Sequence, residues 1–182
     1  MRNLLAIFSF GVLAGCSSMP PEMELDSKVY SGQNAGIVVG ALIEGGPYGT
    51  WLEFRQTETG QSFGWGAKDY FSAWLPAGDY EVHTLGSRRG VMAAYSKPLR
   101  FTVRKGHINY LGEMVYDCQM ASRLSALYGV KSCGALALGE CSVPAPTMKI
   151  CVVDRKEQAV LNFRKRYPDY SNLPIASSVA NF

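Results

Sequence analysis

The sequence predicts a mainly β fold, an antiparallel β-sandwich followed by a C-terminal α-helix. Short apolar or alternating runs recur at intervals of about ten residues and are separated by Gly or Pro, which is typical of an all-β domain. Asp154 and Glu157 stand at the spacing of a capping box, and Pro168 closes the stretch that follows them. This pattern predicts a helix over 155–167, with Val160, Leu161 and Phe163 as its core candidates.

The first fifteen residues, 1–15, are predicted to be a signal peptide. Arg2 supplies a positive start, and residues 4–13 are apolar apart from one Ser and one Gly. Such a run would rise roughly 15 Å as a helix, about half of a hydrocarbon core, so cleavage is favoured over a membrane span. Leu13-Ala14-Gly15-Cys16 then resembles the lipobox of bacterial lipoproteins. The alternative is an ordinary secretory signal peptide with a coincidental cysteine.

The lipobox resemblance implies that Cys16 becomes the first residue and carries a diacylglycerol and an N-linked acyl chain such as palmitate. Two or more acyl chains hold a protein stably on a bilayer. Ser17, rather than Asp, follows the cysteine, which in Gram-negative lipoproteins implies the outer membrane. We therefore expect a lipid-anchored outer-membrane protein that faces the periplasm. Residues 16–34, with two prolines and several acids, are expected to form a flexible tether.

The sandwich core is expected over residues 35–117. Residues 36–43 are continuously apolar, as in a strand that is buried on both faces. Leu52 and Phe54, the turn Glu58-Thr59-Gly60, and then Phe63 and Trp65 predict a β-hairpin. Another strand is expected over 71–75, before the turn Pro76-Ala77-Gly78.

Alternation continues through the second half of this core. On one strand, an inward face is predicted for Tyr80, Val82 and Thr84, and an outward face for Glu81 and His83. The next strand has Leu99, Phe101 and Val103 on one side. A long strand then ends near Cys118, and its shared face is predicted to hold Ile108, Tyr110, Met114 and Tyr116.

Two segments carry a family resemblance. Leu75-Pro76-Ala77-Gly78-Asp79-Tyr80-Glu81-Val82 and Val103-Arg104-Lys105-Gly106-His107-Ile108-Asn109-Tyr110-Leu111-Gly112 resemble the P-x-G-x-Y and V-x-x-G-x-x-x-Y-L-G pattern. That pattern belongs to prealbumin-like (transthyretin or carboxypeptidase-regulatory-like) sandwich modules in bacterial lipoproteins. The resemblance spans roughly residues 36–117 and implies a β-sandwich without an active site.

The remaining residues, 118–182, are expected to be a disulfide-stapled extension that ends in the helix. Four cysteines remain after Cys16, and in an oxidising compartment they indicate two disulfides with three possible connectivities; these cysteines are Cys118, Cys133, Cys141 and Cys151. Sequential pairing is favoured, and a zinc site is the alternative, although no C-x-x-C occurs. Strands are expected over 134–138 and 148–153, while 120–128 fits either a helix or a crossover.

Neither catalysis nor metal binding is indicated. No nucleophile motif accompanies His83 or His107. The carboxylates are spread over different predicted elements: Glu53, Glu58, Asp79, Glu81 and Glu113. We therefore expect no enzyme, no metal and no cofactor beyond the lipid on Cys16. The formal net charge of +3 also argues against a nucleic-acid binder.

Possible binding residues each have a structural explanation as well. Trp51 and Tyr70 would pack in the core, or would form an exposed aromatic strip for a glycan or protein. Arg88 and Arg89 would occupy a surface loop or contact a partner. Arg164, Lys165 and Arg166 would complement the helix dipole, or would contact anionic lipid or an acidic partner.

These observations predict a binding protein of the cell envelope. The first hypothesis is a non-catalytic interaction or structural component with an envelope protein as its partner. The alternative is a lipoprotein that binds a glycan or small ligand, or that inhibits a hydrolase.

Overall fold

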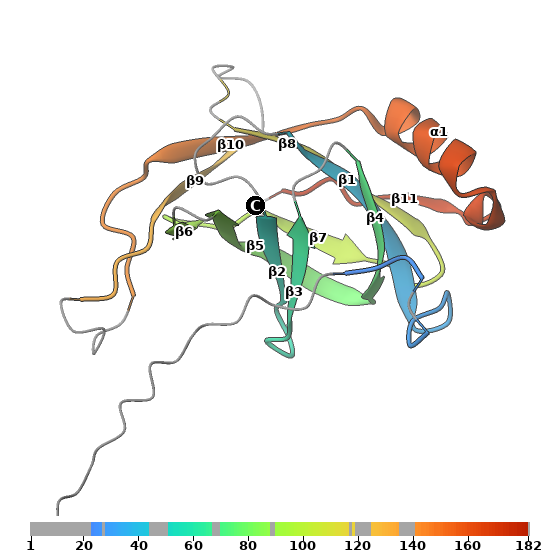
Figure 1. Cartoon of the computed structure of the whole chain (residues 1–182), viewed down its shortest axis with the longest axis horizontal. Helices are drawn as coiled ribbons and strands as arrows, with labels where there is room; N and C mark the ends of the chain where they lie inside the picture. Colours follow the sequence, from blue (N-terminus) through green and yellow to red (C-terminus); the bar gives the residue numbers. More distant parts are fainter. Residues whose placement is uncertain are drawn as a thin grey trace, which may run out of the picture.

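The computed structural model describes residues 23–26, 28–43, 51–66, 70–87, 90–116, 118, 125–134 and 141–181. Within these ranges the chain forms eleven strands, the α-helix α1 (Lys156–Arg166) and the 3-10 helix η1 (Pro168–Tyr170). The strands are β1 (Ala35–Ile43), β2 (Trp51–Gln56), β3 (Ser62–Gly66), β4 (Phe71–Pro76), β5 (Gly78–Ser87), β6 (Gly90–Ala94), β7 (Arg100–Val103), β8 (Ile108–Tyr116), β9 (Ser125–Val130), β10 (Met148–Val153) and β11 (Ile175–Ser177). The predicted mainly β fold with a C-terminal helix is confirmed (Figure 1).

The strands form one curled, mixed sheet in the order β3-β2-β5-β6-β9-β10-β8-β1-β4, with β7 added to β5 and β11 added to β8. β8 runs parallel to both β1 and β11, and the other pairs are antiparallel. The expectation of a purely antiparallel sheet is therefore wrong. The long excursion through β2 to β7 returns the chain beside β1 in the same direction, as a parallel pair requires.

The two ends of the strand order are joined by the chain that precedes β1. The Met23 amide donates to Gly64 O of β3 at 3.0 Å, and the Trp74 amide of β4 donates to Glu24 O at 3.1 Å. Met23 is also buried in the core. The expected tether therefore packs against the sheet from Met23 onward, because residues 23 and 24 satisfy backbone groups at both edges.

β8 contributes to both apolar clusters found among the described residues. In the β1–β8 ladder, Val39 pairs with Tyr110 and Gly40 pairs with Gly112, so Leu111 is an extra residue in a bulge. Ile108 and Tyr110 therefore pack in the cluster beneath α1, whereas Leu111, Met114 and Tyr116 pack in the inner core. The prediction of one shared face along this strand is wrong, because a single extra residue exchanges the two faces.

β5 contains a second bulge. Glu53 of β2 pairs with Thr84 and Phe54 pairs with Val82, which leaves His83 as the extra residue. Thr84 consequently lies beside Glu53 on the outer face and Leu85 enters the core, so the predicted inward face of Thr84 is wrong. The hairpin of β2 and β3 is confirmed, with Gly60 at φ 72° in its turn.

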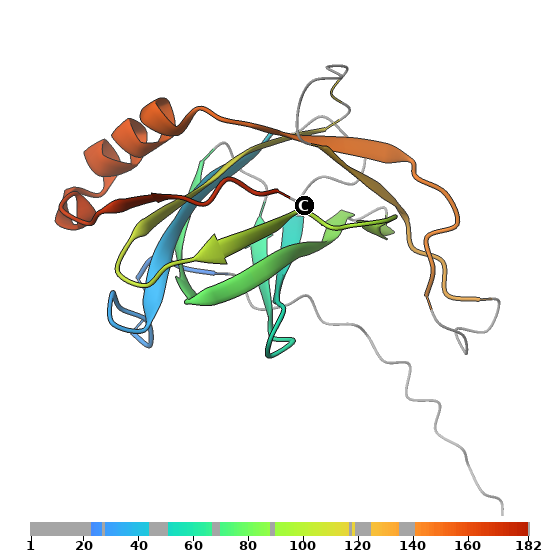
Figure 2. The same cartoon turned by 180° about the vertical axis from the view of Figure 1, so that it is seen from behind.

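The disulfides join Cys118 to Cys151 and Cys133 to Cys141. The favoured sequential pairing is wrong, because β10 lies antiparallel between β8 and β9 and carries Cys151 back to the end of β8. Cys133 and Cys141 instead close a short loop beside the Ser132–Ser142 bridge. Figures 1 and 2 show the chain after β9 and before β10 running together as an arm away from the rest of the sheet.

The residues after Cys118 belong to the same sheet, since β9, β10 and β11 all join it. The strand predicted over 148–153 is confirmed, and the undecided segment 120–128 includes the first part of β9. The strand expected over 134–138 lies almost entirely outside the described residues.

Helix α1 covers the side of the sheet formed by β1 and β8 (Figure 2). Val160 and Phe163 are buried there, but Leu161 is 63% exposed, so its predicted core position is wrong. Asp154 Oδ1 accepts the Lys156 amide at 3.0 Å at the start of the helix. Within the described part of the chain, no helix has the length and apolar character of a membrane span.

The bulge in β8 predicts a measurable difference between two glycines. Gly112 has φ 94°, and a Cβ built there would lie 2.4 Å from Val152 Cγ1, whereas Gly60 has φ 72° with open space around it. Both alanine variants carry left-handed backbone strain of about 1–2 kcal/mol. We expect Gly112→Ala to lower the free energy of unfolding by a further 1–3 kcal/mol or so, because it also overpacks the core. Equal midpoints for the two variants in urea unfolding would contradict the tight packing at the bulge.

Candidate functional site

Several residues predicted to carry function lie outside the described residues. These are Cys16, the expected lipid attachment point, and Arg88 and Arg89, the expected contact loop between β5 and β6. Their roles stay predictions. The described ends of that loop, β5 and β6, are paired antiparallel up to Ser87 and Gly90.

The two aromatic candidates are engaged with different neighbours. Trp51 pairs with Gly86 across β2 and β5, and a Cβ at Gly86 would lie 2.2 Å from Trp51 Cε2, so the indole lies directly over the glycine. Tyr70 packs in the cluster beneath α1 and donates a short hydrogen bond to Glu113 Oε1. Both side chains are half-buried, and their contacts suit packing as the first explanation.

Arg164, Lys165 and Arg166 form the last turn of α1, as predicted. Cations at this end stabilise the helix dipole. The Arg166 guanidinium also lies 5.4 Å from the centre of the Tyr167 ring. Contact of these three residues with lipid or an acidic partner stays a prediction.

The outer face of β2, β3 and β5 gathers a polar cluster. Ser62 Oγ donates to Glu53 Oε1 at 2.6 Å, and His83 Nδ1 lies 3.3 Å from Glu81 Oε1. Sequence analysis places these groups on different elements, and cross-strand pairing brings Glu53, Glu81 and His83 together. His83 and Ser62 are bonded to different carboxylates, so the contacts form a polar network rather than a nucleophile bonded to its base.

The cluster shifts two pKa values. Burial is the largest influence on His83 and lowers its pKa, the nearby Arg55 charge lowers it further, and Glu53 and Glu81 only partly compensate. For Glu53, burial is again the largest single influence and raises the pKa, but hydrogen bonds from Ser62 and Thr84, with the charges of His83 and Arg55, leave it lowered overall. The fold therefore favours neutral His83 beside an ionised Glu53.

A second polar group lies beneath the start of α1. Glu113 is 1% exposed, and its Oε2 lies 3.1 Å from Arg155 Nη1 in an ion pair. The Arg155 amide donates to Tyr110 Oη at 2.7 Å. Burial, followed by the hydrogen bond and charge of Glu113, raises the pKa of Tyr70 to about 12. Tyr70 therefore stays a hydrogen-bond donor to Glu113 across the physiological pH range, and Arg155 and Tyr110 tie the helix to β8.

The third candidate feature is an exposed apolar surface, for whose residues the sequence analysis predicts no function. Val91 and Tyr95 of the β6 chain and Leu127 of β9 are 38%, 46% and 39% exposed. The Lys131 amide donates to Val91 O and the Tyr95 amide donates to Leu127 O, so these residues alternate along one face of two paired strands. We call this surface the β6–β9 apolar face. No alternation in the sequence marks it, because residues 91–95 are continuously apolar.

The chain that follows the second disulfide covers the middle of this face. Gly129 pairs with Ala93, and a Cβ at Gly129 would lie 2.5 Å from Val143 Cγ1. The stiff Val143-Pro144-Ala145-Pro146 segment therefore lies against β9 at this point. The described residues contain no group of three His, Cys, Asp or Glu side chains arranged for a metal ion.

Comparison of the chain with protein families, with curated proteins and with solved structures finds no match in any of the three. The function is therefore inferred from the sequence and geometry of the chain itself.

The outer polar cluster predicts a pH-dependent stability. A histidine with a lowered pKa in the folded state binds protons more readily when unfolded, so stability is present above its ordinary pKa of 6.5 and falls as the pH drops below it. We expect urea midpoints to fall from pH 7.5 to pH 5.0, and His83→Gln to flatten that change. His107→Gln removes the only other histidine and serves as the control. An unchanged slope in His83→Gln would contradict this assignment.

The buried carboxylate predicts a loss of stability in Tyr70→Phe. Removing a donor from a buried charged acceptor costs about 1–3 kcal/mol, and we expect this loss in urea unfolding at pH 7. Tyr170→Phe is the matched control, because Tyr170 contacts Trp74 edge-on in the same cluster through its ring. A loss in Tyr70→Phe no larger than that in the control would show that the Glu113 bond contributes nothing.

Proposed function

We propose that the chain is a lipid-anchored, non-catalytic interaction protein of the bacterial outer membrane that binds an envelope protein through the β6–β9 apolar face. The lipobox at Cys16 supports the anchor, and the prealbumin-like sequence pattern supports a small sandwich-type binding module. The observation that carries the binding role is the group of exposed apolar side chains of Val91, Tyr95 and Leu127. Exposed apolar side chains that share one face of a sheet are candidates for contact sites.

The charges around the face favour a particular kind of partner. Lys131 lies next to Val91, Lys149 is paired with Leu127, and Lys97 follows Tyr95 closely in the chain. None of these three lysines forms an ion pair with another described residue. An apolar centre with a cationic rim complements a protein surface whose own apolar centre has an acidic rim.

The same rim disfavours a second copy of this chain. A two-fold dimer through this face would place equivalent lysine rims against each other, and like charges across an interface weaken association. The Val, Tyr and Leu side chains also suit a protein better than a bilayer, because membrane-inserting surfaces rely on Trp and Phe as well as Leu.

The test places a photo-crosslinking residue at Leu127 or Tyr95 in the full-length protein in cells. We expect one envelope protein to be captured at both positions and to carry acidic residues where it is crosslinked. Leu161, which is 63% exposed on α1, is the control position and should capture none of it. Val91→Asp should reduce capture at least tenfold without changing the thermal midpoint.

Other outcomes would overturn the proposal. Adducts between two copies would show that the face mediates self-association instead. Adducts with lipid would show that it contacts the bilayer instead. Equal capture at Leu161 would remove the apolar face as the site. In the same cells, labelled palmitate should enter the wild-type protein and not Cys16→Ala; incorporation into neither would remove the anchor.

A further inference from the structure

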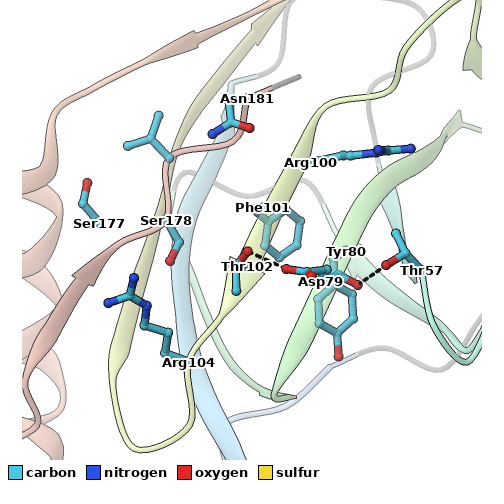
Figure 3. A pocket seen from close by; sticks show the side chains of 11 residues that line it. Thr57, Asp79, Tyr80, Arg100, Phe101, Thr102, Arg104, Ser177, Ser178 and Asn181 are labelled. Carbon is cyan, nitrogen blue, oxygen red and sulfur yellow. Dashed lines mark hydrogen bonds between the residues drawn. The ribbon is translucent and has the colours of Figure 1, made fainter.

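A pocket of about 390 Å³ lies where the curled sheet divides. The first part of β5 pairs with β7, and its last part pairs with β6. The first part of β8 likewise pairs with β11, and its last part pairs with β10. β7 and the chain after β11 meet at the Arg100–Asn181 bridge, where the two residues exchange backbone hydrogen bonds of 2.5 and 2.7 Å. The pocket occupies this junction (Figure 3).

Most of the pocket wall consists of hydrogen-bonding groups. Tyr80 and Phe101 also line it, and their stacked rings pack in the inner core. The polar side chains that line it come from the β2–β3 turn, β5, β7 and the chain around β11: Thr57, Asp79, Thr102, Ser177, Ser178 and Asn181. Hydroxyls, an amide and a carboxylate suit a ligand with many hydroxyl groups.

A buried asparagine holds the backbone of the pocket wall in place. Asn109 is fully buried; its Oδ1 accepts the Arg104 amide at 2.9 Å and its Nδ2 donates to Arg104 O at 3.0 Å. Ser178 Oγ lies 3.4 Å from the same Asn109 Oδ1. One buried amide therefore fixes the backbone of Arg104 and contacts the opposite wall, so the two sides of the pocket keep a defined separation.

The pocket also carries an uncompensated positive charge. Arg104 lines it, and no acidic side chain among the described residues pairs with its guanidinium. Arg100 lies 3.9 Å from Glu81 in a long contact. Figure 3 shows the two arginines pointing to opposite sides, with Arg104 directed toward Ser177 and Ser178. A guanidinium beside hydroxyls favours a carboxylate or a phosphate group.

Asp79 sets the orientation of such a ligand. Its Oδ1 accepts Thr102 Oγ1 at 2.5 Å, and its backbone oxygen accepts Thr57 Oγ1 at 3.2 Å. The carboxylate would repel an anion but accept hydrogen bonds from neutral hydroxyls. Anionic and neutral parts of a ligand are thus directed to different walls of the pocket.

We infer that this pocket binds an acidic saccharide, with its carboxylate or phosphate on Arg104 and its hydroxyls toward Asp79 and Thr102. This site is separate from the β6–β9 apolar face, and its residues come from other strands. The inference therefore does not depend on the envelope partner proposed above.

The experiment uses the full-length protein in mild detergent and saturation-transfer NMR with four probes. These are D-glucuronic acid, D-glucose 6-phosphate and D-glucose, which are observed directly, and inorganic phosphate, which has no carbon-bound protons and is measured by its competition with the sugar signals. We expect binding of at least one acidic sugar, with its Kd at least tenfold lower than for glucose or phosphate alone. The two acidic sugars distinguish a carboxylated from a phosphorylated ligand.

Matched variants locate the binding. Arg104→Met should weaken binding of the acidic sugar at least tenfold, and Arg104→Lys should retain part of it. Lys105→Met removes the neighbouring exposed cation, which does not line the pocket, and should leave the Kd unchanged. Thermal midpoints check that every variant is folded.

Three results would overturn the inference. If neither acidic sugar binds at millimolar concentration, acidic saccharides are not ligands of this pocket. Phosphate binding as tightly as glucose 6-phosphate would reduce the pocket to a simple anion site. An equal loss in Arg104→Met and Lys105→Met would place the binding elsewhere. Leu127→Asp, which changes the β6–β9 apolar face, should leave sugar binding intact. The sugar inference and the proposal of an envelope partner can therefore fail independently.

Discussion

The ladder that β8 makes with its three neighbours is the constraint on which the rest of the structure depends. β8 pairs in parallel with β1 and β11 and antiparallel with β10, so it orders segments from both halves of the chain. The extra residue Leu111 divides its side chains between the inner core and the cluster beneath α1. The same ladder places Cys151 beside the end of β8, where Cys118 reaches it. Helix, core and disulfide all follow from this one strand.

Local pattern in the sequence was sufficient to predict much of this fold. The turn at Gly60 and the continuous apolar run of β1 are short-range signals, and the structure confirms both predictions. The predicted faces of β5 and β8 are wrong, because a bulge arises from the pairing of two strands and leaves no mark in the alternation of a single strand. The prediction of the cysteine pairing is wrong for a related reason, because the pairing of β8 with β10 joins residues that are far apart in the chain.

The candidate surfaces differ in how far the sequence could show them. Glu113 stands out within an apolar strand, but its partners Tyr70 and Arg155 come from distant segments. Val91, Tyr95 and Leu127 look like ordinary core residues in the sequence. Only the register of β6 and β9 shows that they occupy the outer face of the sheet. An exposed apolar surface is therefore a property of the fold, and composition alone does not contain it.

Both bulges fall where a long strand changes partner, and this coincidence explains the pocket. His83 lies between the β7-paired and β6-paired parts of β5, and Leu111 lies between the β11-paired and β10-paired parts of β8. Bulges bend a strand and increase its twist. Each bend directs the two parts of its strand to different neighbours, so β7 and the chain after β11 approach each other with a space between them. The polar pocket is thus a consequence of the same two extra residues that rearrange the core.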